Sequence, residues 1–349
     1  MRATIFYGPG DVRVADRPEP TVLDPTDVVV EVTAGCVCGS DLWDYRGVRP
    51  TAKPRHIGHE LVGVVTDAGR EVKTLGIGDF VIAPFDLSCG HCQACRHSFY
   101  SACDQVTFVG GTDRQGRVVD GGQGERARLP FADPSLVKVP GPIDPELIPS
   151  LLTLSDVFPT GHHAAVSAGV GPDTTVVVVG DGAVGLCAVL ASARLGAPRI
   201  IAMSRHADRA ALAREFGATD IVAERGAEGI AAVRDLLGGD LADTALECVG
   251  TDLAMEQALG SVRGGGRVGF VGVPAGGSQV PIGTLFSRNI TIGGGMAPAR
   301  RYIPELLEDV LAGTVNPGMV FTQTFALDDI AAAYEAMSNR SAIKSLVLP

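Results

Sequence analysis

Four cysteines lie close together in one short segment of the chain. Two, two and seven residues separate them in turn, at Cys89, Cys92, Cys95 and Cys103. Four thiolates at such spacing can complete a tetrahedral zinc shell and leave no coordination position open for chemistry. We therefore predict a structural zinc ion in this segment. Free buried cysteines, disulfides and an iron–sulfur cluster are the alternatives that the spacing leaves open.

A second group of residues, spread along the chain, could form a reactive metal centre. Cys38 precedes Ser40, His59 precedes Glu60, and Asp156 follows much later. One thiolate, one imidazole and one carboxylate make a three-ligand zinc set that keeps a fourth position for substrate. Taken singly, such residues are often structural, and Asp156 could simply cap a following helix. The combination predicts a catalytic zinc site.

A glycine-rich turn indicates a dinucleotide site. Residues 175–179 form an apolar run that predicts a buried strand. The next residues, which open a predicted helix, are Gly180-Asp-Gly182-Ala183-Val184-Gly185. A strand, glycines and a helix in this order allow a tight turn and bring a pyrophosphate against the helix N-terminus. We predict NAD(P) binding, and a glycine-rich turn without a ligand is the alternative.

The residues after the next predicted strand favour NADP over NAD. An NAD enzyme usually ends this strand, here residues 199–203, with a carboxylate that binds the adenosine ribose. This chain has Ser204 instead, followed by Arg205 and Arg209. A hydroxyl with nearby guanidinium groups would accept a 2′-phosphate through charge-assisted hydrogen bonds. Alternatively, the two arginines only solvate the start of a helix.

Two kinds of sequence pattern must position these residues. Up to about residue 150, the sequence predicts short strands separated by Gly and Pro, at residues 27–32, 59–65, 79–84 and 125–130. From about residue 170, short apolar runs alternate with helical segments, which predicts parallel strands joined by helices. Beyond about residue 297, we expect two helices and two strands to return to the first domain. A chain of 349 residues is long enough for two domains.

The segment Gly58-His59-Glu60-Leu-Val-Gly63, with Gly69 six residues later, resembles the signature of zinc-containing alcohol dehydrogenases. These belong to the medium-chain dehydrogenase/reductase superfamily, and the other motifs follow in the family's order. The resemblance implies an α/β fold with a Rossmann dinucleotide-binding domain at residues 158–296. A β-rich GroES-like catalytic domain would comprise residues 1–157 and 297–349, with the structural zinc lobe at about 86–106.

The resemblance also implies roles for individual residues. It assigns the catalytic zinc to Cys38, His59 and Asp156. Glu60 would lie beside the metal or serve as an alternative ligand, and Asp156 resembles the branch that contains bacterial secondary-alcohol dehydrogenases. Ser40 would bond the substrate oxygen and pass its proton outward, and Thr160 would lie near the nicotinamide. Many relatives end the proton relay with a histidine where this chain has Trp43, so the proton would leave through water or through a nearby group such as Asp44 or Tyr45.

These implications describe a zinc-dependent alcohol dehydrogenase. It would move a hydride reversibly between a small alcohol, aldehyde or ketone and NAD(P), with NADP preferred. A zinc-free quinone or enone reductase would keep the dinucleotide domain but lack the metal ligands. A non-enzymatic protein that binds zinc and a dinucleotide would keep the fold without turnover. Metal content and alcohol-dependent NADPH formation separate these alternatives.

Charge and hydropathy exclude two classes of partner. The net charge of −11, without a basic stripe, argues against nucleic acid. We find no apolar stretch of about 20 residues for a membrane helix and no signal peptide at the start, so the cytoplasm is the expected location. The family resemblance implies a homodimer or a homotetramer.

Overall fold

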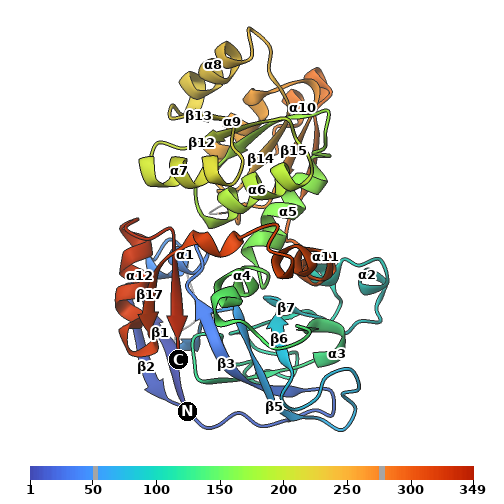
Figure 1. Ribbon diagram of the computed structural model, residues 1–349, viewed down its shortest axis with the longest axis vertical. Helices are drawn as coiled ribbons and strands as arrows, with labels where there is room; N and C mark the ends of the chain where they lie inside the picture. The colour runs from blue at the N-terminus through green and yellow to red at the C-terminus, as the bar shows by residue number, and fades with distance from the viewer. Residues whose placement is uncertain (50–53, 275–279) are drawn as a thin grey trace. The chain divides into compact units, whose positions relative to one another are not determined.

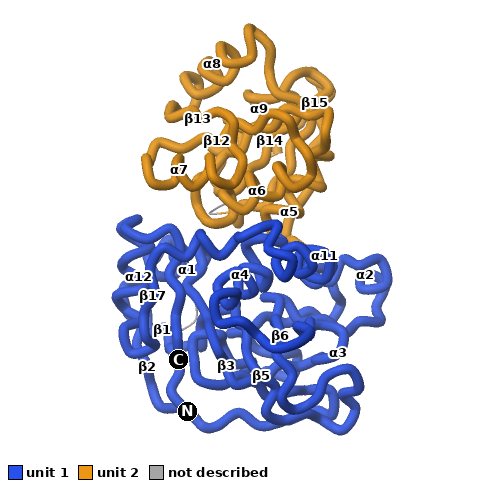
Figure 2. The backbone as a smooth tube through the Cα atoms, viewed as in Figure 1, with its two compact units in different colours: residues 1–159, 298–349 blue, residues 160–297 orange. Residues whose placement is uncertain are grey.

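The chain divides into two compact units, which Figure 2 shows in different colours. The computed structural model describes residues 1–49, 54–274 and 280–349. Unit 1 contains residues 1–159 and 298–349, and unit 2 contains residues 160–297. The C-terminal segment therefore belongs to the same compact unit as the N-terminal part of the chain.

Unit 1 is built on a mainly antiparallel sheet that joins strands far apart in the sequence (Figure 1). Across the sheet the strands are β10 (Val137–Lys138), β6 (Phe80–Ala83), β5 (Leu61–Ala68), β3 (Val28–Cys36), β18 (Lys344–Leu348) and β17 (Phe321–Ala326), and β9 (Arg126–Leu129) also pairs with β3. Side chains of a strand alternate between its faces. Val28, Val30 and Val32 of β3 accordingly enter one apolar core with Leu61 and Val65 of β5.

Shorter elements surround this sheet. A second sheet consists of β2 (Asp11–Asp16), β1 (Arg2–Gly8) and β4 (Arg55–His56), and β7 (Asp86–Leu87) pairs with β8 (Thr107–Phe108). The α-helices are α1 (Asp41–Tyr45), α2 (Gln93–Arg96), α3 (Ala132–Ser135), α4 (Ile148–Thr153), α11 (Ala299–Leu311) and α12 (Ile330–Ser338). Four 3₁₀ helices are η1 (Tyr100–Ala102), η2 (Pro145–Leu147), η3 (Pro317–Val320) and η4 (Leu327–Asp329).

Unit 2 is a parallel sheet with helices between successive strands, which confirms the alternation predicted from the sequence. The strand order is β13 (Asp220–Val222), β12 (Arg199–Met203), β11 (Thr175–Val179), β14 (Ala242–Glu247), β15 (Val262–Phe270) and β16 (Thr291–Gly294). The helices are α6 (Ala183–Arg194), α7 (Ala207–Glu215), α8 (Gly226–Leu236), α9 (Asp252–Ser261) and α10 (Ile282–Arg288). Helix α5 (Val157–Ser167) begins in unit 1 and continues into unit 2.

The central strand of unit 2 explains why its sequence is so apolar. Four of the five residues of β11 are buried valines, because helices cover both faces of a parallel sheet. Strand β11 lies between β12 and β14, so its C-terminal end is at the middle of the sheet edge. Among the described residues, no helix is long and apolar enough to cross a membrane.

Candidate metal centres and dinucleotide site

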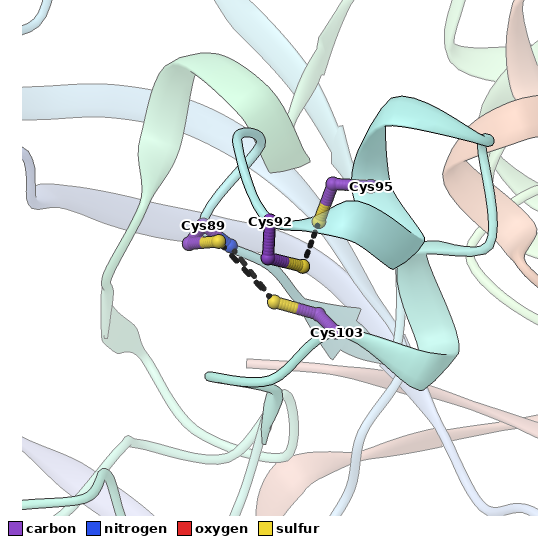
Figure 3. Close-up of side chains that lie close together, drawn as sticks. All are labelled: Cys89, Cys92, Cys95 and Cys103. Atoms are coloured by element: carbon purple, nitrogen blue, oxygen red, sulfur yellow. Dashed lines mark hydrogen bonds between the residues drawn. The ribbon is translucent and has the colours of Figure 1, made fainter.

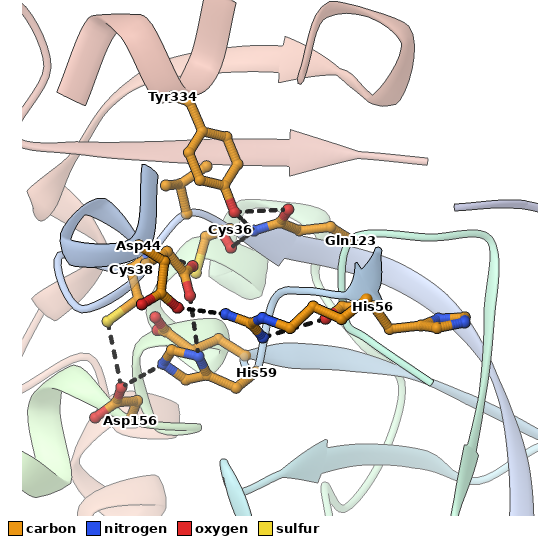
Figure 4. Close-up of polar contacts among 12 residues, drawn as sticks. Cys36, Cys38, Asp44, His56, His59, Gln123, Asp156 and Tyr334 are labelled. Carbon is orange, nitrogen blue, oxygen red and sulfur yellow. Dashed lines mark hydrogen bonds and ion pairs between the residues drawn. The ribbon is translucent and has the colours of Figure 1, made fainter. Parts of the chain in front are cut away.

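The residues predicted to form the reactive metal centre come together in unit 1 (Figure 4). Strands β3 and β5 are antiparallel neighbours, with Gly35 paired to Leu61. The residues just after β3 and just before β5 are therefore adjacent, which brings Cys38 to His59. Asp156 reaches the same place from the turn after α4. One donor atom from each of Cys38, His59, Glu60 and Asp156 lies within 4.8 Å of the others.

Distances within this cluster are those of groups arranged around one point. Cys38 Sγ lies 3.7 Å from Asp156 Oδ2, and His59 Nε2 lies 3.3 Å from the same oxygen. Cys38 and Asp156 are 7% and 9% exposed, and Glu60 is fully buried. The glycine before His59 has a packing reason, since a Cβ on Gly58 would lie 2.5 Å from Gln123 Cγ. Backbone and side chains thus fix the position of the imidazole.

Electrostatics show why the cluster needs a cation. Burial raises the pKa of the Cys38 thiol, so the thiolate is disfavoured without a positive partner. Burial opposes a charged His59, but Cys38 and Asp41 outweigh it and hold the pKa of this imidazole well above its ordinary value. A divalent metal ion would stabilise the thiolate and the carboxylate together. Sulfur, nitrogen and oxygen donors in this number fit zinc.

Two further carboxylates, besides the three predicted ligands, lie at the cluster and contact different groups. Asp41 lies 3.5 Å from His59 Nδ1 and also accepts a hydrogen bond from the Cys38 amide at 3.1 Å. Such a carboxylate fixes the imidazole tautomer that presents Nε2 to a metal. Glu60 instead accepts a hydrogen bond from Lys344 Nζ at 2.7 Å. This bond holds one Glu60 oxygen toward β18.

Lys344 is a site residue that the sequence analysis missed. It is fully buried on β18, where it also donates to the Val37 carbonyl at 3.2 Å. Burial alone would lower its pKa, but Cys36 and Glu60 raise the pKa of Lys344 well above its ordinary value. The only sign of its role in the sequence is a single lysine at the start of the apolar segment Lys344–Leu348. A lysine in that position resembles the polar end of an ordinary strand.

The four clustered cysteines also meet in unit 1, and Figure 3 shows their sulfurs turned toward one another. Cys92 Sγ lies 3.5 Å from Cys95 Sγ, and Cys103 Sγ lies 3.5 Å from Cys89 Sγ. None of the eight cysteines, all of them in described parts of the chain, is in a disulfide. Backbone amides of Cys89 and Gln105 approach Cys103 Sγ at 3.3 and 3.2 Å. Amides placed around thiolates are expected of a closed zinc site.

The thiol pKa values in this cluster are spread widely. Backbone hydrogen bonding lowers the pKa of Cys92 to about 6, whereas burial raises the pKa of Cys103 to about 12. Without a cation, the four groups cannot all be thiolates near neutral pH. A zinc ion removes this conflict because coordination deprotonates thiols outright.

In unit 2, the glycine-rich turn has the shape that a pyrophosphate requires. Gly180 has a φ of +120°, and Gly182 is the N-cap of α6. A Cβ on Gly185 would lie 2.0 Å from the Gly180 carbonyl oxygen, so only glycine allows this helix to begin so close to β11. Ala183 and Val184 form the first turn of α6, whose free amides point outward from the helix. These residues fit a dinucleotide.

The residues predicted to select NADP over NAD differ in their burial and in their contacts. Ser204 and Arg209 are buried, and both contact Asp181, the second residue of the glycine turn. Arg205 is exposed. Sequence analysis did not assign Asp181 a role, because the variable positions of a glycine motif carry no signal by themselves. Thr160 is buried in α5, at the start of unit 2, and Ser40 precedes α1 in unit 1.

The sequence matches two protein-family domains and is similar to known zinc-type alcohol dehydrogenases. Residues 24–141 match the alcohol dehydrogenase GroES-like domain, and residues 183–312 match the zinc-binding dehydrogenase domain. A Mycobacterium tuberculosis protein named as a probable zinc-binding alcohol dehydrogenase is 37% identical over 98% of this chain and 86% of its own length. Zinc-type alcohol dehydrogenase B of Aspergillus flavus is 32% identical over 96% of this chain and 78% of its own.

Among solved structures, the chain is similar to an alcohol dehydrogenase from Thermus sp. ATN1. The TM-score is 0.90 and the sequence identity is 32%. The match covers 100% of this chain and 99% of the other. Both metal clusters and the glycine turn lie within the matched region.

Proposed function

The chain belongs to the zinc-containing alcohol dehydrogenases of the medium-chain dehydrogenase/reductase superfamily, and from this premise we propose that it transfers hydride reversibly between a small alcohol or carbonyl compound and NAD(P), with NADP preferred. Secondary alcohols are included among the proposed substrates, because Asp156, at the position of the third ligand, resembles the branch that contains bacterial secondary-alcohol dehydrogenases. One observation carries the proposal: Cys38, His59 and Asp156 converge although they are far apart in sequence.

The residues of the two proposed zinc sites have different roles. When bound, zinc supplies a Lewis acid for the substrate oxygen, and the nicotinamide exchanges a hydride with the substrate carbon. Cys38, His59 and Asp156 would hold the catalytic zinc, and Asp41 would keep His59 in the coordinating orientation. Glu60 lies within reach as an alternative ligand, but its bond to Lys344 holds it back. Cys89, Cys92, Cys95 and Cys103 would hold the structural zinc.

Ser40 is the residue proposed to take the alcohol proton. It precedes α1, and its hydroxyl makes no capping bond to that helix. Beyond Ser40, the route outward has few candidates. Asp44 is ion-paired with Arg49 and Arg55, and Tyr45 packs on Tyr334 with ring centroids 5.2 Å apart. We therefore propose that water carries the proton past Trp43.

The dinucleotide would bind to the glycine turn of unit 2. Gly180, Gly182 and Gly185 admit the pyrophosphate, and the amides of Ala183 and Val184 would bind its oxygens. Ser204 ends β12 with a hydroxyl, and the exposed Arg205 follows directly with a guanidinium group. A serine and an arginine at this point favour a 2′-phosphate. Thr160 is proposed to contact the nicotinamide.

A homo-oligomer is proposed through the sheet of unit 2. Strand β16 ends the strand order, so one of its edges has no strand partner in the described residues. Neighbouring α10 exposes Phe286 by 85% and Ile282 by 66%. An uncovered strand edge beside apolar side chains suits pairing with a second copy of the chain. Light scattering of the purified protein tests for a dimer or tetramer. A molar mass of one chain at micromolar concentration would exclude the proposed homo-oligomer.

The experiment for the proposed activity combines metal analysis with turnover. Purified protein should contain two zinc ions per chain and form NADPH in the presence of a secondary alcohol. Cys38→Ser and His59→Ala should each lose one zinc and at least about a thousandfold in kcat/KM, because zinc stabilises charge in the transition state. His97→Ala removes an exposed imidazole outside the cluster and should change neither. Full activity in a zinc-depleted His59→Ala variant would reject the proposal.

A further inference from the structure

The glycine turn of unit 2 contains a carboxylate that pyrophosphate binding does not require. Asp181 lies between Gly180 and Gly182, and its side chain is only 13% exposed. Its Oδ2 accepts a hydrogen bond from Ser204 Oγ at 2.9 Å. Arg209 donates to the Asp181 carbonyl at 3.0 Å and lies 3.7 Å from Oδ1. The carboxylate is thus held in a fixed position by two residues of the predicted cofactor-selecting segment.

The topology explains why these residues meet. Strands β11 and β12 are parallel neighbours in register, and Val179 pairs with Met203. Residues that follow the two strands therefore lie together at the carboxyl edge of the sheet. Asp181 follows β11, and Ser204 follows β12. This edge is where a dinucleotide places its adenosine ribose.

The position of Asp181 matters because Ser204 stands where NAD enzymes usually carry an acid. A carboxylate beside the ribose accepts a hydrogen bond from the 2′-hydroxyl of NAD(H) and repels the 2′-phosphate of NADP(H). In this chain the acid is absent from β12, but Asp181 supplies one 2.9 Å from the Ser204 hydroxyl. Arg209, which is buried against Asp181, offsets part of its charge.

We propose that Asp181 is a cofactor-selectivity residue, which accepts the ribose 2′-hydroxyl of NAD(H) and restrains the preference of this site for NADP(H). This inference rests on the proposed function, since it concerns the same adenosine site. Ser204 and Arg205 favour the phosphate, and Asp181 opposes it. The wild-type protein therefore binds both cofactors, with a selectivity smaller than Ser204 and the arginines alone would produce.

The test is a comparison of dissociation constants in the purified holoenzyme, without substrate. Binding of NADPH and NADH is followed by nicotinamide fluorescence in wild type and in Asp181→Asn. The amide keeps the size of the side chain and an acceptor for Ser204 but removes the charge. We expect Kd for NADPH to fall by about tenfold or more, with Kd for NADH unchanged or raised. The difference should shrink at high salt, because screening weakens the repulsion.

A matched control separates a local effect from a change in net charge. Asp235 is exposed in the last turn of α8, which runs back toward the amino edge of the sheet. Asp235→Asn should therefore leave the ratio of the two Kd values as in wild type. If Asp181→Asn unfolds, Asp181→Ser is used instead. Because the two Kd values are compared within one variant, a general loss of folded protein does not change their ratio.

The two proposals fail in different ways. An unchanged ratio in Asp181→Asn, or equal changes in both Kd values, would overturn the role of Asp181. A wild-type preference for NADH would instead contradict the NADP part of the proposed function, and Asp181→Asn would still report whether the carboxylate selects.

Discussion

At the scale of single residues, buried charge marks the reactive site more clearly than any motif. Cys38, Asp156, Glu60 and Lys344 are all buried in one region of unit 1. Taking ionised groups out of water is costly unless they are paired or bound to a metal. The ion pair between Glu60 and Lys344 satisfies one part of this requirement, and a zinc ion held by the other ligands would satisfy the rest.

Replacing Lys344 tests how far the buried ion pair supports the fold. Lys344→Met would leave Glu60 buried without its cation, which should lower the free energy of unfolding by about 3–5 kcal/mol. Lys344→Arg should recover part of this loss. The control is Lys138→Met, because Lys138 is 51% exposed in its pair with Asp79 and should cost about 1 kcal/mol or less. Equal urea midpoints for the two methionine variants would contradict the prediction.

Asp86 gives a prediction about pH. Its side chain is buried and neither oxygen has a hydrogen-bond partner among the described residues, and burial raises its pKa to about 7. Between about pH 4 and pH 7, the folded protein therefore keeps the proton on Asp86, whereas the unfolded chain releases it. The stability that the protonated group provides is complete below about pH 4 and declines as the pH rises toward about 7, by up to about 4 kcal/mol.

Asp86→Asn should remove this part of the pH dependence. Unfolding free energies from urea titrations between pH 5 and pH 8 should fall less steeply in Asp86→Asn than in wild type. Asp67→Asn, at an exposed position of β5, is the control and should keep the wild-type slope. Parallel curves for wild type and Asp86→Asn would show that the Asp86 carboxyl is already ionised in the folded protein.

Residues of this kind can be predicted from the sequence only when they belong to a pattern. The four cysteines could be predicted because their spacing alone suits one metal ion. Cys38, His59 and Asp156 could be predicted because their combination has a chemical meaning. Lys344, Asp86 and Asp181 were missed, since each is a single charged residue whose importance depends on neighbours brought to it by the fold.

At the scale of elements, the cysteine segment depends on its metal rather than on regular structure. Between β7 and β8 it contains only α2 and η1, which are four and three residues long. Its apolar cluster consists largely of the cysteines themselves, together with Tyr100, Val106 and Phe131. Such a segment has little to hold it without zinc, because a structural zinc site contributes folding energy directly.

Cys95→Ser tests this dependence. The variant should lose one zinc per chain, and limited proteolysis should cut the segment between Cys89 and Cys103 at least about tenfold faster, since the opened loop lacks packing. Cys248→Ser removes a thiol from unit 2 and should retain both zinc ions and the wild-type cleavage rate. Cleavage of the Cys95→Ser segment at the wild-type rate would show that packing alone holds it.

The elements themselves differ in how well the sequence predicts them. The apolar runs at β3, β11 and β12 predict their strands, because burial of most of their side chains leaves a continuous hydrophobic signal. Strands β4, β7 and β8 have two residues each and were not predicted. Elements so short exist only because partners far away in sequence pair with them.

At the scale of the whole molecule, the two units contain separate groups of candidate site residues. Unit 1 gathers both metal clusters, and unit 2 contains the glycine turn with Ser204 and Asp181. The match to the GroES-like domain lies within unit 1, the match to the zinc-binding dehydrogenase domain covers much of unit 2 and continues to residue 312, and the chain spans nearly the full length of the Thermus alcohol dehydrogenase. The sequence motifs lie in two different patterns of elements, which is the basis for the domains predicted at residues 1–157 with 297–349 and at residues 158–296.

The most direct test of the proposed catalytic zinc site is a zinc-edge anomalous map from crystals of the purified, zinc-replete protein. We predict one peak about 2.3 Å from Cys38 Sγ and about 2.0–2.2 Å from His59 Nε2 and an Asp156 oxygen, with a second peak among the four clustered cysteines. A map with zinc only among the cysteines, and with Cys38, His59 and Asp156 turned away from a common point, would contradict the account.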